Sequence, residues 1–222
     1  MLALRRRDSG AIRVEAEAGD GEAEIALVGN PNVGKSTLFN RLTGLRQHTG
    51  NWPGKTVERA EGRCRSARRA YRLVDLPGCY SLLARSPEER VTRDYLRAGR
   101  ADAVIVVCDA SSLERNLPLA LQTAELCPRM LLCVNLMDEA ARRGVTPDLE
   151  RLEKELGTPV LGITAHERVS RRRVLNALDA LLDAPAPRPR RVAYPEGAAV
   201  SLSEGGEGDA AAEERTVTAL LR

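Results

Sequence analysis

Short runs of apolar residues alternate with longer segments of helical periodicity from residue 24 to about residue 183. Several of the runs are uninterrupted, which is typical of strands that helices cover on both faces. The runs predict strands at residues 24–28, 57–64, 71–75, 103–109, 130–135 and 159–163. The periodic segments predict helices at residues 35–43, 88–98, 113–127, 148–156 and 171–182. This alternation predicts an α/β fold with a mostly parallel six-stranded sheet and helices on both faces.

The two ends of the chain lack this pattern. Residues 1–22 are rich in Arg, Glu, Ala and Gly, and we expect a flexible N-terminal tail there. Residues 185–191 read PAPRPRR, which is typical of an extended linker. Only a short helix is predicted after this linker. We therefore expect one domain at residues 23–184, followed at residues 185–222 by a linker and an incomplete helical segment.

The composition excludes several classes of protein. With 34 basic and 31 acidic residues the net charge is +3, so we expect no nucleic-acid partner, since such proteins carry a strong basic excess. The longest charge-free apolar run, residues 103–108, is far shorter than the roughly 18 residues of a membrane span. The five cysteines form no C-x-x-C pair. An odd number of scattered cysteines is typical of a reduced cytosolic chain, not of a disulfide framework or a zinc site.

The strongest motif is GNPNVGKS at residues 29–36, which fits the phosphate-binding pattern G-x-x-x-x-G-K-[ST]. It lies between a predicted strand and a predicted helix, as this motif requires. Its backbone amides then converge on phosphate at the positive helix N-terminus. Lys35 is expected to bridge the β- and γ-phosphates, and the Ser36 hydroxyl to ligate magnesium. The predicted contacts to nucleotide are Gly29, Asn30, Pro31, Asn32, Val33, Gly34, Lys35, Ser36 and Thr37.

Two later segments supply further groups for a magnesium-bound nucleotide. Asp75, in LVDLPG, ends a predicted strand, where a carboxylate can hold the metal's shell through water. Gly78 can offer its amide to a γ-phosphate, and Pro77 beside it is included in the predicted site. Thr56 can supply a second hydroxyl to magnesium, with Gly54 from the same segment in the site; the alternative for Thr56 is an ordinary surface threonine.

The choice of base is predicted from NLMD at residues 135–138. The Asp138 carboxylate can accept two hydrogen bonds from guanine N1 and N2, whereas adenine would leave the charge unpaired. Asn135 is expected to tie this segment to the phosphate loop. The Ala165 amide, in GITA, can reach the guanine O6, and Leu136 and Thr164 complete the predicted base site. An Asn–Asp helix cap is the alternative interpretation of the motif.

In this order the motifs resemble those of the Ras-like P-loop GTPases of the TRAFAC class. The closer resemblance is to the cytosolic N-terminal G domain of ferrous iron transport protein B, over about residues 24–183. It is carried by GNPNVGKSTLFNRLTG (29–44), GNWPGKTVE (50–58), VDLPGCYSL (74–82), DASSLERNLPLALQT (109–123) and VNLMDEA (134–140). The resemblance implies a GTPase that hydrolyses GTP to GDP and regulates iron(II) uptake by a membrane permease domain. It places such a domain at the cytoplasmic side of the bacterial inner membrane, itself soluble.

The resemblance also implies a mechanism. Its first switch corresponds to about residues 47–58, with Thr56 as the magnesium threonine, and its second to about residues 75–90. Family members with asparagine at the position of Asn32 resemble potassium-activated GTPases, in which the ion offsets transition-state charge in place of an arginine finger. The implied catalytic residues are Lys35, Thr56, Gly78 and Asn32. The implied cofactors are GTP or GDP, Mg²⁺ (Ser36, Thr56, Asp75) and K⁺ (Asn32).

The chain departs from the family and from other GTPases at several points. Cys79 follows Gly78 where Ras-like enzymes have a glutamine that orients water, so we expect slow hydrolysis and a packing role for Cys79. Leu136 replaces the base-stacking lysine of many GTPases, which predicts weaker nucleotide binding. Trp52 is expected to be a mobile aromatic of the first switch. The family continues into a helical bundle and a permease, whereas this chain ends at Arg222, so transport chemistry is expected outside it.

Two other functions stay open. A soluble ribosome-assembly or tRNA-modifying GTPase shares GxPNVGKST, although NLMD in place of N-K-x-D and the lack of an RNA-binding appendage count against it. A guanine-nucleotide switch that does not hydrolyse GTP is the second, because no catalytic glutamine is visible. The resemblance also allows small cytosolic iron-transport accessory proteins as partners.

Overall fold

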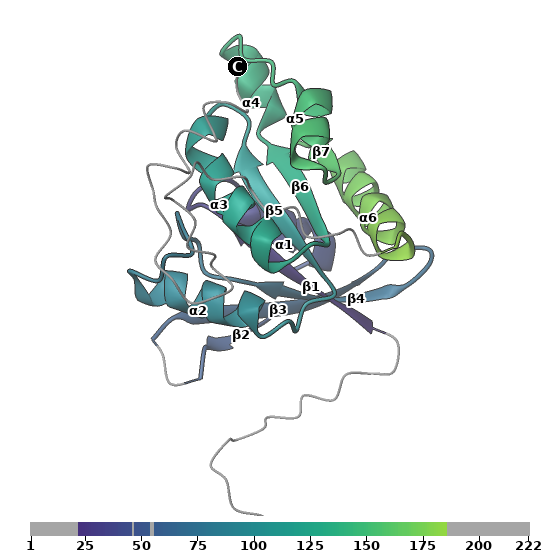
Figure 1. The fold of residues 1–222 in the computed structure, drawn as a ribbon. Coiled ribbons are helices and arrows are strands. Elements are labelled where there is room, and N and C mark those ends of the chain that lie inside the picture. Colours follow the sequence, from purple (N-terminus) through teal and green to yellow (C-terminus); the bar gives the residue numbers. More distant parts are fainter. Residues whose placement is uncertain (1–21, 46, 54–55, 186–222) are drawn as a thin grey trace, which may run out of the picture.

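The computed structural model describes residues 22–45, 47–53 and 56–185. Its centre is a seven-stranded sheet with the strand order β2-β3-β4-β1-β5-β6-β7 (Figure 1). The strands from β4 to β7 in this order run parallel to one another, whereas β3 is antiparallel to both β4 and β2. The strands are β1 (Glu22–Gly29), β2 (Gln47–Asn51), β3 (Glu58–Arg65), β4 (Ala70–Asp75), β5 (Ala103–Asp109), β6 (Met130–Asn135) and β7 (Val160–Gly162).

Helices cover both faces of this sheet. They are α1 (Lys35–Thr43), α2 (Pro87–Arg97), α3 (Leu113–Leu126), α4 (Met137–Arg142), α5 (Leu149–Leu156) and α6 (Arg168–Asp183). Buried side chains of α1 and α6, such as Phe39 and Leu178, pack on one face with Ile105 of β5. Buried side chains of α2, α3 and α5 pack on the other face. The prediction of an α/β fold of the Ras-like type, with a mostly parallel sheet between helices, is confirmed.

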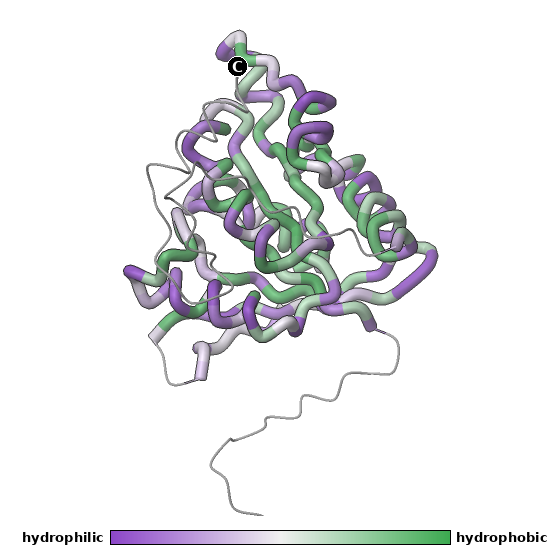
Figure 2. Tube along the Cα trace, in the orientation of Figure 1, coloured by the Kyte–Doolittle hydropathy of each residue, from purple (hydrophilic) through white to green (hydrophobic). Residues whose placement is uncertain are grey.

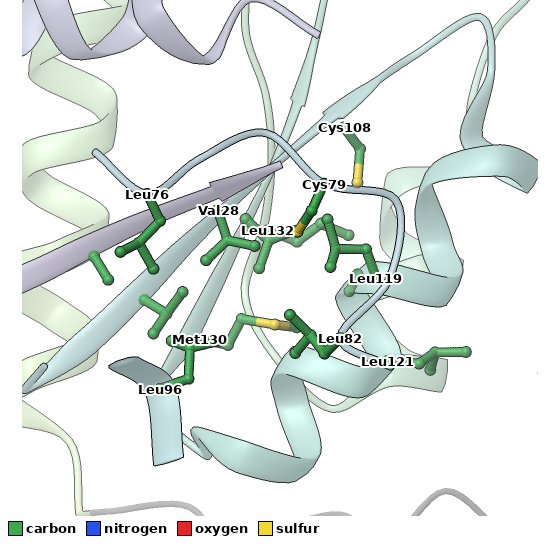
Figure 3. Close-up of a cluster of buried hydrophobic side chains, with 14 of the residues drawn as sticks. Val28, Leu76, Cys79, Leu82, Leu96, Cys108, Leu119, Leu121, Met130 and Leu132 are labelled. Atoms are coloured by element: carbon green, nitrogen blue, oxygen red, sulfur yellow. The ribbon is translucent and has the colours of Figure 1, made fainter. Parts of the chain in front are cut away.

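The central strands β5 and β6 are apolar up to their last residues because both of their faces are buried. Along β5, Val104 and Val106 belong to the cluster under α2 and α3, whereas Ile105 and Val107 belong to the cluster under α1 and α6. Figure 2 shows these hydrophobic strands between helices in which hydrophobic and hydrophilic residues alternate. Figure 3 shows the first cluster, in which Val28, Leu132 and Leu119 lie together. Burial of this kind stabilises the fold by about 25 cal/mol for each Å² of apolar surface removed from water.

The sheet has one strand more than the six predicted. The additional strand, β2, has the polar sequence QHTGN and lies at the edge of the sheet, where it pairs only with β3. Its hydrogen bonds are made by the main chain, and its described side chains are exposed, so no hydrophobic pattern marks it. The short helix α4 was also not predicted.

The domain boundaries remain predictions, since most of the two predicted end segments lies outside the described residues. One residue of each end segment is described. Glu22 belongs to β1, so the sheet begins inside the segment predicted as a tail, and Pro185 follows α6. Among the helices that the structure describes, none combines the length and the apolar character that crossing a bilayer requires.

Candidate functional site

The phosphate-loop motif lies between the carboxyl end of β1 and the amino end of α1, as its spacing predicted. Gly34 has a left-handed backbone with φ of 83°, and a Cβ there would collide with the side-chain nitrogen of Asn135. A Cβ on Gly29 would lie 2.7 Å from the carbonyl oxygen of Val107. Both glycines of the motif are therefore required by the close approach of neighbouring groups, and Gly34 also by its backbone conformation.

The amino end of α1 has the features of an anion-binding site. Its first turn contains no acidic residue, and no side chain caps it. Ser36 and Thr37 in this turn are exposed, as are Pro31 and Asn32 in the loop before it. Val33 is buried and anchors the loop. Because the first amides of a helix lack partners within the helix and carry partial positive charge, this end favours a phosphate group.

Lys35, the first residue of α1, forms an ion pair with Asp75 at the carboxyl end of β4. Their side chains are only 10% and 13% exposed. Burial raises the pKa of the Asp75 carboxyl, and the charge of Lys35 opposes this rise. The structure thus brings together the lysine predicted for phosphate and the carboxylate predicted for magnesium. A phosphate at the loop would compete with Asp75 for the lysine.

The segment after β4 runs directly beside the phosphate loop. The Cys79 amide donates to the carbonyl of Gly29 at 3.3 Å. A Cβ on Gly78 would lie 3.4 Å from the backbone nitrogen and Cα of Pro31. The carbonyl of Pro77 accepts a hydrogen bond from a threonine hydroxyl of α2 at 3.3 Å, so this segment joins the loop to α2.

Asn135 connects the phosphate loop to the predicted base site. It is fully buried; its Nδ2 donates to the carbonyl of Val33 at 2.9 Å, and its Oδ1 accepts from the Ala165 amide at 2.9 Å. The contact between Asn135 and the phosphate loop is the one that the sequence predicted. One side chain therefore sets the separation of two loops that are distant in the sequence.

Asp138 has one carboxylate oxygen without a partner. Its Oδ2 lies 3.3 Å from a guanidinium nitrogen of Arg142, one turn later in α4. Its Oδ1 is buried and accepts no hydrogen bond from the residues that the structure describes. Since buried polar atoms are generally paired, this oxygen is suited to a donor from a ligand, such as guanine N1–H or N2–H. Beside it, Leu136 has a left-handed backbone with φ of 61°, and Thr164 is buried and bonded to Ser170.

The predicted first switch, about residues 47–58, comprises β2 and the segment that leads from it to β3. The Trp52 amide donates to the carbonyl of Val57 at 2.8 Å, and Thr56 is exposed beside this bond. Gly54 lies outside the described residues. Trp52 was expected to be a mobile aromatic, but it is only 8% exposed and contacts Tyr95 of α2. The sequence around Trp52 gives no indication that it packs against Tyr95.

Sequence reasoning also missed a contact between α3 and the second switch. The guanidinium of Arg115 lies 4.7 Å from the centre of the Tyr80 ring. The carbonyl of Arg115 accepts from Nδ2 of Asn30 at 3.2 Å, while Oδ1 of Asn30 is buried without a partner. Arg115 belongs to the segment LERNL, which carries part of the family resemblance. This resemblance could have marked Arg115 as a candidate site residue.

Cys79 is a packing residue in this structure, as expected from the sequence. It is 3% exposed and lies in the cluster with Leu76 and Leu82 (Figure 3). Burial raises the pKa of its thiol to about 11. A neutral, buried thiol is neither a nucleophile nor a group that orients water.

The buried thiols predict a loss of stability at alkaline pH. Burial raises the pKa of Cys64 to about 11 and of Cys133 to about 12, from 9.0 for a free thiol. The unfolded chain therefore loses these protons at lower pH than the folded chain. The thiols contribute fully to the free energy of unfolding below pH 9, and this contribution falls as the pH rises towards 11. Urea midpoints at increasing pH should fall by up to about 1.4 kcal/mol per pH unit and thiol. A Cys64→Ala variant should show a shallower decline, and a flat profile for the parent chain would contradict the prediction.

Residues 23–178 match the family model described as ferrous iron transport protein B. The chain belongs to this family. The Fe(2+) transporter FeoB of Salmonella typhimurium is 44% identical over 163 residues, which cover 72% of this chain and 21% of that protein. The match thus spans about a fifth of the length of such curated relatives.

Two solved structures of the family show the same fold. The G domain of T. maritima FeoB is 38% identical, with a TM-score of 0.68 over 72% of this chain and 98% of that one. The cytosolic domain of the same transporter in its GMPPNP form is 37% identical, with a TM-score of 0.75 over 79% of this chain and 69% of that one. The matched region of this chain is thus an N-terminal G domain of FeoB.

Proposed function

We propose that this chain binds GTP with Mg²⁺, hydrolyses it slowly to GDP with the assistance of K⁺, and thereby regulates an iron(II) transporter. The observation that carries this proposal is the position of Asn135. Its two hydrogen bonds, to Val33 and to Ala165, hold the phosphate loop beside the segment predicted to read the base. The GMPPNP form of the related T. maritima domain supports binding of a GTP analogue at a site of this kind.

The residues divide between the two ends of the nucleotide. The free amides at the start of α1 and the side chain of Lys35 bind the phosphates, and Lys35 then exchanges Asp75 for phosphate oxygens. The unpaired Oδ1 of Asp138 accepts from the guanine ring, whose N1–H and N2–H it can pair. Because adenine has no matching donors, Asp138 selects guanine.

Ser36, Thr56 and Asp75 fit a magnesium site by the chemistry of their donors. Hydroxyl and carboxylate oxygens are the ligands that this ion prefers. Ser36 is exposed at the start of α1, and Asp75 lies at the end of β4, next to Lys35. Magnesium bound there supplies positive charge to the β- and γ-phosphate oxygens. Thr56 joins the site from the first switch.

For hydrolysis, the backbone amide of Gly78 is placed to donate to the γ-phosphate, and backbone groups of the first switch orient the attacking water. The buried thiol of Cys79 takes no part. Asn32 is exposed in the phosphate loop, and its amide oxygen is a suitable ligand for potassium. Potassium bound there supplies the charge that an arginine finger supplies elsewhere.

The test compares GTP turnover in potassium chloride and in sodium chloride at equal ionic strength. We expect turnover about 10-fold or more faster in potassium, because one charge at the transition state is worth at least this factor. Asn32→Ala should remove the difference and keep GDP binding, whereas Asn176→Ala, at an exposed position of α6, should behave like the parent chain. Equal rates in both salts would reject the potassium-assisted mechanism. GTP binding with no turnover in either salt would favour the switch that does not hydrolyse GTP.

The iron(II) transport itself is assigned to a membrane permease domain of the same transporter, and small cytosolic accessory proteins are further proposed partners. This assignment puts the chain at the cytoplasmic side of the inner membrane. Family membership supports it over a ribosome-assembly or tRNA-modifying role.

A further inference from the structure

Six side chains form a closed ring between the first switch and α2. We call it the switch ring; in order around the ring its members are Trp52, Arg59, Glu61, Arg72, Glu24 and Tyr95. They come from the first switch, β3, β4, β1 and α2. Each member contacts the next, so the ring joins the first switch to α2 by two routes.

In the aromatic half of the switch ring, Trp52 contacts both Tyr95 and Arg59. Its ring centre lies 5.5 Å from that of Tyr95, and the two planes meet at 75°, an edge-to-face contact. The guanidinium of Arg59 lies 5.0 Å from the same Trp52 ring, within the range of a cation–π interaction. Trp52 is therefore held from two sides.

The charged half of the switch ring holds these two partners in place. Arg72 donates to Glu24 at 2.9 Å and to Glu61 at 2.8 Å. Glu61 also pairs with Arg59, and the Tyr95 hydroxyl donates to the other oxygen of Glu24. The side chains of Arg72 and Glu24 are each 19% exposed, so water screens this pair less than a surface ion pair.

The docking of Trp52 is nevertheless incomplete. Its Nε1 is buried and finds no acceptor in the described part of the chain, which destabilises the docked position relative to a hydrated indole. A cavity of about 250 Å³ lies beside it, lined in part by Trp52, Pro53 and Tyr95. Release of Trp52 would therefore hydrate the indole nitrogen and offset part of the lost contact with Tyr95.

We propose that Trp52 is a positioning residue for the first switch: docked in the switch ring it keeps Thr56 in the exposed position seen here, and GTP with Mg²⁺ undocks it. Thr56 lies next to Val57, whose carbonyl is bonded to the Trp52 amide, so a shift of Thr56 towards magnesium displaces Trp52. GDP leaves Trp52 docked. This inference rests on the nucleotide binding proposed above.

Trp52 is the only tryptophan of the chain, so its fluorescence reports the docked state without labelling. Titration with GMPPNP and Mg²⁺ should shift the emission to longer wavelength as the indole meets water, and titration with GDP should leave it unchanged. An unshifted emission in a chain that calorimetry shows to bind GMPPNP would overturn the inference alone. A chain that binds neither nucleotide would contradict the proposed function instead.

Variants of the ring test whether it opposes the GTP-bound state. Tyr95→Leu should raise the affinity for GMPPNP relative to GDP about 3- to 10-fold, because an edge-to-face pair contributes about this factor. Arg59→Gln should raise the same ratio about 2- to 5-fold. Arg63→Gln is the matched control on β3, since its ion pair with Glu22 lies outside the ring, and should leave the ratio within about 2-fold.

Equal losses of affinity for both nucleotides in Tyr95→Leu, or an equal change of the ratio in Arg63→Gln, would overturn the proposal. Thermal unfolding of each variant shows which of them fold. If Tyr95→Leu does not fold, Tyr95→Phe keeps the aromatic contact with Trp52 and removes only the hydrogen bond to Glu24. It should raise the ratio by a smaller factor, of about 2, and an unchanged ratio would then overturn the proposal.

Discussion

An Asp138→Asn variant is expected to bind GTP about 100-fold or more weakly and to prefer xanthosine triphosphate. The buried Oδ1 of Asp138 has no hydrogen-bond partner among the residues that the structure describes, so it can accept from the guanine ring. An asparagine in the same place can present an amide donor towards the 2-amino group of guanine, and two donors cannot pair. Xanthine has a carbonyl oxygen at this position and accepts from the new amide instead. Calorimetric titration with both nucleotides measures the exchange of preference.

The matched control for this variant is Asp148→Asn. Asp148 caps α5, where its carboxylate accepts from the Arg151 amide at 2.9 Å, and asparagine can keep this bond. The control should bind GTP like the parent chain. GTP affinity that is unchanged in Asp138→Asn would show that Asp138 does not read the base.

An Asn135→Ala variant is expected to lose both stability and nucleotide binding. Removal of this side chain leaves the Val33 carbonyl and the Ala165 amide without their partner, at about 1–3 kcal/mol for each group that stays buried. We expect a loss of about 2–4 kcal/mol in the free energy of unfolding, or a melting temperature lower by about 5–15 °C. Since the two loops also lose their common support, the affinity for GTP should fall about 10-fold or more.

Asn116→Ala separates the two effects. Asn116 is equally buried, at 3% exposure, and its amide accepts from the Asp109 amide at 3.1 Å and donates to the Ser112 carbonyl at 2.7 Å. Its loss should lower the melting temperature by a similar amount and change GTP affinity much less. If both variants weaken GTP binding alike, then Asn135 acts through stability alone.

The central elements could be predicted from the sequence because local rules and burial agree there. The bounds of α1 follow from the glycine before it and the glycine after it, both in left-handed conformation. The strands β5 and β6 have the predicted bounds, because every residue between their ends is apolar and buried. The edge strand β2 could not be predicted in this way, since its polar residues pair with β3 only through the main chain.

The candidate site divides in the same way. Motif spacing located Lys35, Asp75 and Asn135. Asp75 and Asn135 end β4 and β6, Lys35 begins the helix after β1, and parallel strands end at one edge of the sheet. The partners of Trp52 are different. Arg59 comes from β3 and Tyr95 from α2, and only the packed fold brings both side chains to one indole ring. Pairs of this kind leave no periodic signal in a single sequence.

The bridge that Asn135 makes has a consequence for fragments of the nucleotide. Because one buried amide fixes the phosphate loop against the Ala165 segment, the two ends of the site form one rigid frame before any ligand arrives. For the nucleotide proposed above, the ribose then acts as a tether between two pre-aligned anchors. Inorganic triphosphate and guanosine should each bind weakly, and the intact molecule much more tightly than either piece, since the second anchor is reached at high effective concentration.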